Sequence, residues 1–190
     1  MTLPKLLVTS FATWKPEQPS NASDDLLSAI YPFYSRREQL HWLRHLPVDF
    51  QQAPTKVIQA AQTLQPDAII CCGMKEIGSH ICIEERALRA EQTRHTSVNV
   101  NWLGANLTAT EISHDAGQFV CNSLYFDVLK HFQVSRTHYP GQPECPCIFI
   151  HIPVLTPFNR DQTIADFVTI LARMYRLAAL HASTSLPLSA

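Results

Sequence analysis

One cysteine of this chain lies where a helix could make it a nucleophile. The apolar residues that follow Cys121 recur with the period of a helix that has one buried face, so we expect a helix over 119–132 with Cys121 in its first turn. Free backbone N–H groups and the helix dipole favour a thiolate at that position. The competing interpretation is that Cys121 is only a small apolar residue on the buried face, because free cysteines are among the most buried residue types.

A histidine near the end of an apolar run is the second candidate. His151 lies in the run 148–152, which is followed by Pro153, a residue that cannot continue a central strand. Catalytic groups gather at the carboxyl ends of strands in open α/β sheets, so His151 is positioned to act as a general base. From the residues alone, a histidine that is merely hydrogen-bonded within the core remains an equal alternative.

A pair of carboxylates could supply the group that orients such a base. Glu84 and Glu85 follow the alternating residues Ile81 and Ile83. Acidic residues at the end of a strand usually form a solvated edge, which is the alternative to a functional role here. If one of them lies beside His151, it would fix the tautomer of the imidazole, as a base that activates a thiol requires.

Several segments, in order along most of the chain, resemble the pyroglutamyl peptidases of type I, a family of cysteine exopeptidases. The nucleophile, histidine and glutamate segments of that family resemble AGQFVCN at 116–122, FIHIP at 149–153 and EERA at 84–87. The first, second and third strand regions of that family resemble, in this order, LLVTSF at 6–11, LPVDF at 46–50 and PDAIICCG at 66–73. The tract from 112 to about 175 carries the strongest resemblance.

The resemblance implies a role for each candidate. It makes Cys121 the nucleophile, His151 the base that activates it, and Glu85 the carboxylate that orients the imidazole. Glu85 is preferred to Glu84 because the glutamate of the family precedes a basic residue, which here is Arg86; the register could be shifted by one residue.

The resemblance also implies a slot for the lactam ring of the substrate. Phe11 and Trp14 match the aromatic residues that hold the ring in the family, and Phe119 and Val120 complete the slot. Asn21 resembles an asparagine that follows the first strand in the family, and it is equally well explained as the N-cap of the next helix.

The chain departs from the family at two places near this slot. The turn after the first strand is glycine-rich in the family, whereas this chain has Ser10, Lys15 and Pro16 there, and glycines allow the backbone to approach a ligand closely. The stretch 88–108 is shorter than usual, and neither Arg86, Arg89 nor Arg94 can be assigned to the arginine that the family places near the oxyanion. These departures change the surroundings of the slot and therefore bear on the choice of substrate.

Composition and charge exclude several classes of protein. The chain has 190 residues, 46% of them hydrophobic, and a formal net charge of −1, which suits one compact domain and offers no electrostatic footprint for nucleic acid or an anionic membrane. The N-terminus lacks the apolar region of a signal peptide, and no segment approaches the roughly 20 apolar residues of a membrane span. We therefore expect a cytoplasmic protein that binds neither nucleic acid nor membrane.

The six cysteines indicate thiols rather than disulfides or a metal site. Their spacing is not that of a secreted scaffold, and a chain of this length does not need cross-links. Cys145, Cys147 and His151 could in principle bind zinc, but zinc sites normally pair two C-x-x-C motifs, and no second pair is present. No metal or other cofactor is expected.

The apolar patterns predict alternating strands and helices. We expect strands over 5–11, 39–47, 67–73, 107–113 and 147–153, an extended segment over 79–90, and helices over 22–31, 53–64, 119–132 and 161–180. This order predicts a three-layer α/β/α fold with a mostly parallel central sheet, formed by a single domain over 1–180 and followed by a frayed tail over 181–190.

Two functions follow from the sequence. The first is a cysteine exopeptidase that removes N-terminal pyroglutamate from peptides through a thioester, which the presence of Cys121, His151 and the glutamates favours. The second is a repurposed or inactive relative that binds another small lactam or peptide, which the altered segments 12–20 and 88–108 favour. The resemblance also leaves open association into a homo-oligomer.

Overall fold

Strands and helices alternate along the chain, as the sequence predicts. The computed structural model describes residues 3–35, 39–138 and 145–184. The strands are β1 (Leu6–Phe11), β2 (Leu40–Leu46), β3 (Ala68–Lys75), β4 (Ile81–Glu84), β5 (Arg86–Arg89), β6 (Gln92–His95), β7 (Thr110–Ser113) and β8 (Cys147–Pro153). The helices are α1 (Ala22–Ile30), α2 (Gln52–Leu64), α3 (Val100–Gly104), α4 (Val120–His138) and α5 (Arg160–Thr184).

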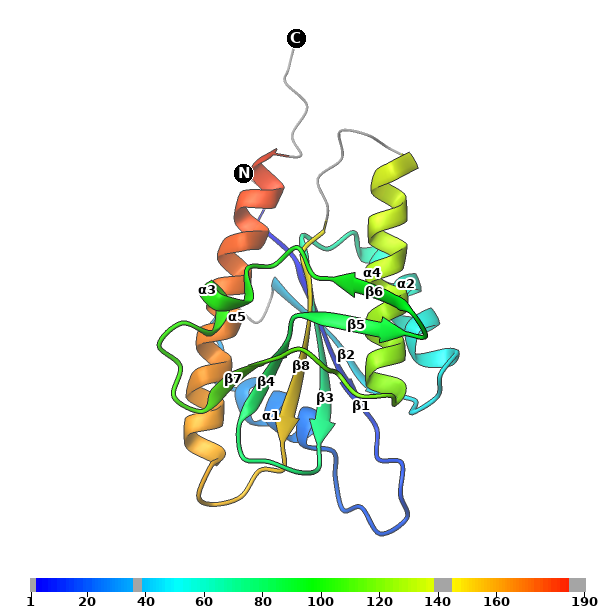
Figure 1. Cartoon of the computed structure of the whole chain (residues 1–190). Helices are drawn as coiled ribbons and strands as arrows, with labels where there is room; N and C mark the ends of the chain where they lie inside the picture. Colours follow the sequence, from blue (N-terminus) through cyan, green and yellow to red (C-terminus); the bar gives the residue numbers. More distant parts are fainter. Residues whose placement is uncertain (1–2, 36–38, 139–144, 185–190) are drawn as a thin grey trace.

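A mixed central sheet carries the fold. Its six strands lie in the order β2-β1-β3-β8-β4-β7 (Figure 1). The pairs β1–β2, β1–β3, β3–β8 and β4–β7 are parallel, whereas β4 runs antiparallel to β8. Gly73 of β3 and Cys82 of β4 both pair with His151 of β8, so the middle of the sheet brings these three strands together around the histidine.

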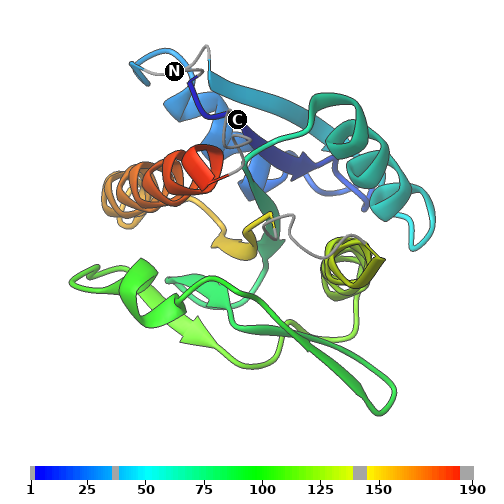
Figure 2. The same cartoon turned by 90° about the horizontal axis from the view of Figure 1, so that it is seen from above.

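Helices cover both faces of the sheet and form the predicted three layers. One core cluster joins Ile70, Ile83 and Ile150 to Leu26 of α1 and Phe167 of α5. The other core cluster, on the opposite face, joins strand residues to α2 and α4. Figure 2 shows α4 and α5 on opposite sides of the sheet. The alternation of side chains along each strand therefore sorts residues between an α1/α5 face and an α2/α4 face.

The expected elements are confirmed within a few residues, with two additions. The extended segment predicted over 79–90 is divided between β4, which joins the central sheet, and β5, which pairs with β6 in a separate two-stranded sheet. The strand β6 and the short helix α3 lie between the predicted segment 79–90 and the predicted strand 107–113, where the sequence predicted no elements.

The last helix is longer than predicted. α5 runs to Thr184, so the first residues of the predicted tail are helical, and 185–190 lie outside the described residues. In the described ranges, no helix combines the length and apolar character that crossing a membrane requires.

Candidate active site

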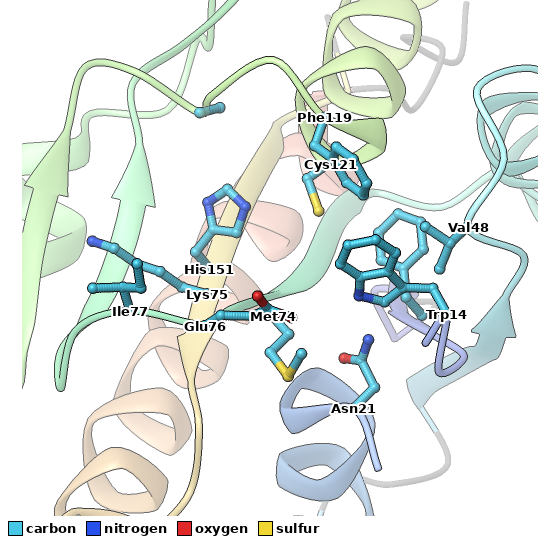
Figure 3. Close-up of a pocket in the computed structure, with 12 residues that line it drawn as sticks. Trp14, Asn21, Val48, Met74, Lys75, Glu76, Ile77, Phe119, Cys121 and His151 are labelled. Carbon is cyan, nitrogen blue, oxygen red and sulfur yellow. The ribbon is translucent and has the colours of Figure 1, made fainter. Parts of the chain in front are cut away.

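Two of the candidate residues, Cys121 and His151, meet in a cleft at the carboxyl ends of β3 and β8. The cleft has a volume of about 390 Å³ and is lined by both Cys121 and His151. That volume is in the range of sites for small ligands. Figure 3 shows the sulfur of Cys121 and the imidazole of His151 facing each other across this cleft.

Cys121 lies in the first turn of α4, as predicted. Cys121 is half-buried, whereas the other five cysteines are buried. The next residue, Asn122, fixes the start of the helix, because its side chain accepts a 2.8 Å hydrogen bond from Leu88 N and donates a 2.6 Å bond to Leu88 O on β5. These contacts with β5 hold the start of α4, which carries Cys121, in place.

His151 is paired with a buried carboxylate. Nδ1 of His151 lies 2.7 Å from Oε1 of Glu84, whose side chain is 2% exposed. This contact leaves Nε2 for Cys121, with which His151 also hydrogen-bonds. The other oxygen of Glu84, Oε2, is buried and has no hydrogen-bond partner among the described residues. The carboxylate therefore depends on the imidazole for compensation of its charge.

The carboxylate beside the histidine is Glu84, one residue before the expected Glu85. Glu85 lies after the last residue of β4 and makes a 2.8 Å contact with His114 instead, with about a third of its side chain exposed. Successive side chains of an extended segment point to opposite faces, so the two glutamates cannot both reach the α2/α4 face on which His151 lies. The register of the prediction was therefore wrong by one residue.

The surroundings of His151 stabilise its charged form. Burial alone lowers the pKa of His151, but the hydrogen bonds and charges of Cys121 and Glu84 outweigh burial and raise the pKa of His151 to about 9. At neutral pH the geometry thus favours an imidazolium that can pair with a thiolate on one side and a carboxylate on the other.

Gly73 provides the space in which the sulfur of Cys121 lies. A Cβ atom at Gly73 would stand 2.7 Å from Sγ of Cys121 and 2.8 Å from Cζ of Phe149. The ring of Phe149 in turn packs 4.9 Å from the imidazole of His151, measured between ring centroids. A side chain at position 73 would therefore have to displace the sulfur or the ring that supports the histidine.

Replacement of Gly73 by alanine is expected to lower kcat/KM about a hundredfold for any substrate on which Cys121 acts, because a displacement of about 1 Å between reacting groups has an effect of that size. The measurement is steady-state kinetics together with thermal unfolding. Gly104→Ala is the matched control, since its Cβ would meet no atom closer than 3.4 Å and it lies in α3. Equal activity of Gly73→Ala and wild type would contradict the close approach.

The predicted slot residues line the cleft, with one exception. Phe11, Trp14, Asn21 and Phe119 all contribute to its wall. The rings of Trp14 and Phe119 are in contact, with centroids 4.8 Å apart. Val120, in contrast, is buried in the core on the α2/α4 face and is not among the lining residues, so its placement in the slot was wrong. Val120 is the first residue of α4, and its side chain packs into the core instead of lining the cleft.

Asn21 is the N-cap of α1. Its Oδ1 accepts hydrogen bonds from the backbone N and the hydroxyl of Ser23, and its Nδ2 donates to Ala12 O. The expected role of Asn21 as a helix N-cap is therefore confirmed. Asn21 also lies in the cleft wall.

The residues that replace glycines at the end of β1 and in the loop after it have partners of their own. Ser10 is buried and donates a 2.7 Å hydrogen bond to Asp24 of α1, which also receives two bonds from Arg44. Lys15 contacts both carboxylate oxygens of Glu76 at 2.6 and 2.8 Å, and thus joins the loop after β1 to the loop after β3. The altered segment is fixed by these contacts at the rim of the cleft.

The arginines of the shortened stretch are engaged away from the cleft. Arg86 donates to His114 O, Arg89 pairs with Asp127, and Arg94 donates to Gln133.

Within the ranges the structure describes, no group of three or more His, Cys, Asp or Glu side chains is arranged to hold a metal ion. Sequence reasoning missed Val48, Met74, Lys75, Glu76, Ile77 and Ala116 as lining residues.

Comparisons with known proteins point to one group. A protein of Bacillus subtilis strain 168 named pyrrolidone-carboxylate peptidase is 25% identical over 206 aligned residues, which cover 94% of this chain and 92% of the relative. No family model matches the chain.

Solved structures of similar fold carry related names. Pyroglutamyl peptidase I of Bacillus amyloliquefaciens superposes with a TM-score of 0.73 at 18% identity, covering 91% of this chain and 97% of that one. Pyrrolidone carboxyl peptidase of Thermococcus litoralis gives 0.71 at 17% identity, with 96% of each chain covered. These structures show a shared fold. The resemblance predicted from the motifs is confirmed: in sequence and in fold, this chain is similar to the pyroglutamyl peptidases of type I.

Proposed function

We propose that the protein is a cysteine exopeptidase that removes N-terminal pyroglutamate from peptides. The observation that carries this proposal is the contact chain from Cys121 through His151 to Glu84 in a cleft of about 390 Å³. A thiol, a base within reach of it and a carboxylate behind the base are the parts of a nucleophilic site. The similarity to pyrrolidone-carboxylate peptidase supplies the substrate class.

In the proposed mechanism, the thiolate of Cys121 attacks the carbonyl carbon that links the lactam ring to the next residue. Backbone N–H groups in the first turn of α4 have no carbonyl partner within the helix, and they are suited to bind the oxyanion that forms. The imidazolium of His151 then gives its proton to the leaving nitrogen as the C–N bond breaks, which yields a thioester and a shortened peptide.

Hydrolysis of the thioester completes the cycle. Neutral His151 takes a proton from water as the water oxygen attacks the thioester carbonyl, and pyroglutamate leaves when the C–S bond breaks. Glu84 holds Nδ1 of the imidazole throughout, so that Nε2 faces the sulfur. The site needs no other group to balance these steps.

The direct test is release of 7-amino-4-methylcoumarin from a pyroglutamyl conjugate. We expect hydrolysis that a thiol alkylator abolishes. Absence of hydrolysis, although Cys121 is alkylated readily, would replace the peptidase proposal by a repurposed relative that binds another lactam or peptide.

Specificity for the closed ring is expected to be strong. The aromatic wall formed by Phe11, Trp14 and Phe119 fits a flat ring, whereas the open glutamyl side chain would bring an unpaired carboxylate into it. Burying such a charge costs several kcal/mol, so kcat/KM for pyroglutamyl over glutamyl conjugates should differ by about a thousandfold or more. Comparison of the two coumarin conjugates measures this ratio, and similar rates would contradict the assignment of the slot.

A further inference from the structure

The cleft has two unlike ends on either side of the Cys121–His151 pair. Trp14, Val48 and Phe119 lie at one end, whereas the side chains of Lys75 and Ile77 lie at the other (Figure 3). If, as the proposed function requires, the aromatic end holds the lactam ring, the residue that leaves on cleavage must extend toward the end formed by the loop after β3.

Lys75 is the cation at the leaving-group end. Among the described lining residues of the cleft, it is the one Lys or Arg side chain. The other nearby cation, Lys15, is held by two contacts to Glu76. In Figure 3 the amine of Lys75 lies on the far side of His151 from Cys121, so an anion that meets it belongs to the leaving residue rather than to the ring.

The present partners of Lys75 leave its charge available. Its Nζ lies 2.8 Å from Sγ of Cys82 and 3.2 Å from Oε1 of Glu111. Cys82 stays a neutral thiol at neutral pH, because its pKa is raised to about 11, mainly by burial. Glu111 is more than half exposed, and an ion pair of that kind is weak. The ammonium has three N–H donors, so one remains for a ligand.

We infer that Lys75 forms an anionic subsite that selects substrates with a carboxylate on the residue following the pyroglutamyl group. The carboxylate can come from an acidic side chain of that residue or from its own backbone carboxyl group in a pyroglutamyl dipeptide. In either case it accepts a charge-assisted hydrogen bond from Nζ of Lys75. Ile77, which is 85% exposed at the same end, offers an apolar surface to the stem of the leaving residue.

The test compares three substrates in wild type and variants. Pyroglutamyl-alanine carries a backbone carboxylate. The α-amide of pyroglutamyl-glutamic acid, in which the backbone carboxyl group is amidated, carries only a side-chain carboxylate. Pyroglutamyl-alanine amide carries neither. The quantity measured is the ratio of kcat/KM for each carboxylate substrate to kcat/KM for the neutral amide. The substrate whose ratio changes identifies the source of the carboxylate.

We expect Lys75→Met to lower the ratio for at least one carboxylate substrate about tenfold, the effect of losing a hydrogen bond to a charged group. Glu111→Gln, which frees the ammonium from its competitor, should raise the same ratio roughly threefold. Lys15→Met is the matched control and should leave the ratio unchanged even if the absolute rate falls.

The outcomes separate this inference from the proposed function. If wild type cleaves all three substrates and Lys75→Met leaves both ratios unchanged, the anionic subsite is overturned while the peptidase proposal stands. If wild type cleaves none of the three, the proposed function is overturned and the subsite with it. A folded Glu111→Gln variant gives a second reading of the ratio in case Lys75→Met does not fold.

Discussion

Cys121→Ser is expected to lower kcat/KM for a pyroglutamyl substrate at least about a thousandfold and to leave the fold intact. A serine hydroxyl is a weaker nucleophile than a thiol, so the variant loses the group that His151 and the start of α4 are placed to activate. The half-buried position of Cys121 tolerates the smaller oxygen without a cavity in the core. Kinetics with the coumarin conjugate and thermal unfolding measure the two effects.

Cys145→Ser is the control for this substitution. The thiol of Cys145 donates to Pro66 O, a bond that a hydroxyl can also make, and the residue lies at the opposite end of β8 from His151. Its activity should equal that of wild type. Loss of activity in Cys145→Ser but not in Cys121→Ser would overturn the assignment of the nucleophile.

Alkylation of the unmodified protein tests the same assignment independently. Burial raises the pKa of Cys72 and of Cys82, and Cys71, Cys145 and Cys147 are also buried. Limited alkylation followed by peptide mapping should therefore label Cys121 first. Preferential labelling of Cys145 or Cys147 would contradict both the site and the mechanism.

Local patterns predicted the elements that carry Cys121 and His151. The helical period after Cys121 and the apolar run around His151 are strong signals, because each element buries a continuous face. The hairpin β5–β6 has no such signal: β6 is mostly exposed and its sequence, QTRH, lacks apolar alternation. Its position depends on contacts with α4, such as those of Asn122, which no local pattern encodes.

The strand pattern of the sequence already indicates which glutamate contacts His151. Ile81 and Ile83 alternate along β4, and isoleucines alternate in the same way along β8, and both sets pack on the α1/α5 face. The residues that alternate with these isoleucines, including Glu84 and His151, must then share the opposite face. The resemblance favoured Glu85 through its basic neighbour, whereas the strand period alone selects Glu84.

The far wall of the cleft could not be predicted from motifs. Val48 follows β2 and Met74 to Ile77 end or follow β3, so these residues meet Cys121 only because β2 and β3 share one sheet and α4 packs on its face. The same holds for Gly73, whose close approach to the sulfur of Cys121 depends on the packing of α4 against β3. Residues of this kind become visible once the order of strands is known.

Glu84→Gln is expected to lower kcat/KM about a thousandfold, whereas Glu85→Gln should change it by less than about twofold. The amide of glutamine can present N–H rather than oxygen to Nδ1 of His151, which favours the tautomer that cannot accept the thiol proton. Glu85 is the matched control because it has the same side chain, is next in sequence and contacts His114 at the surface instead. A larger loss in Glu85→Gln than in Glu84→Gln would restore the register predicted from the sequence.

The pH profile of Glu84→Gln distinguishes orientation of the base from a general loss of stability. In wild type the pKa of His151 is raised from 6.5 to about 9, so the imidazolium, and the stabilisation it gives the folded protein, is fully present below pH 6.5 and is lost as pH rises through about 9. Activity that needs the thiolate–imidazolium pair should therefore decline on the alkaline side near pH 9. Removing the charge of Glu84 removes one cause of the raised pKa, so the alkaline limb of the variant should move to lower pH. An alkaline limb that is unchanged in Glu84→Gln would mean that the carboxylate does not control the protonation of His151.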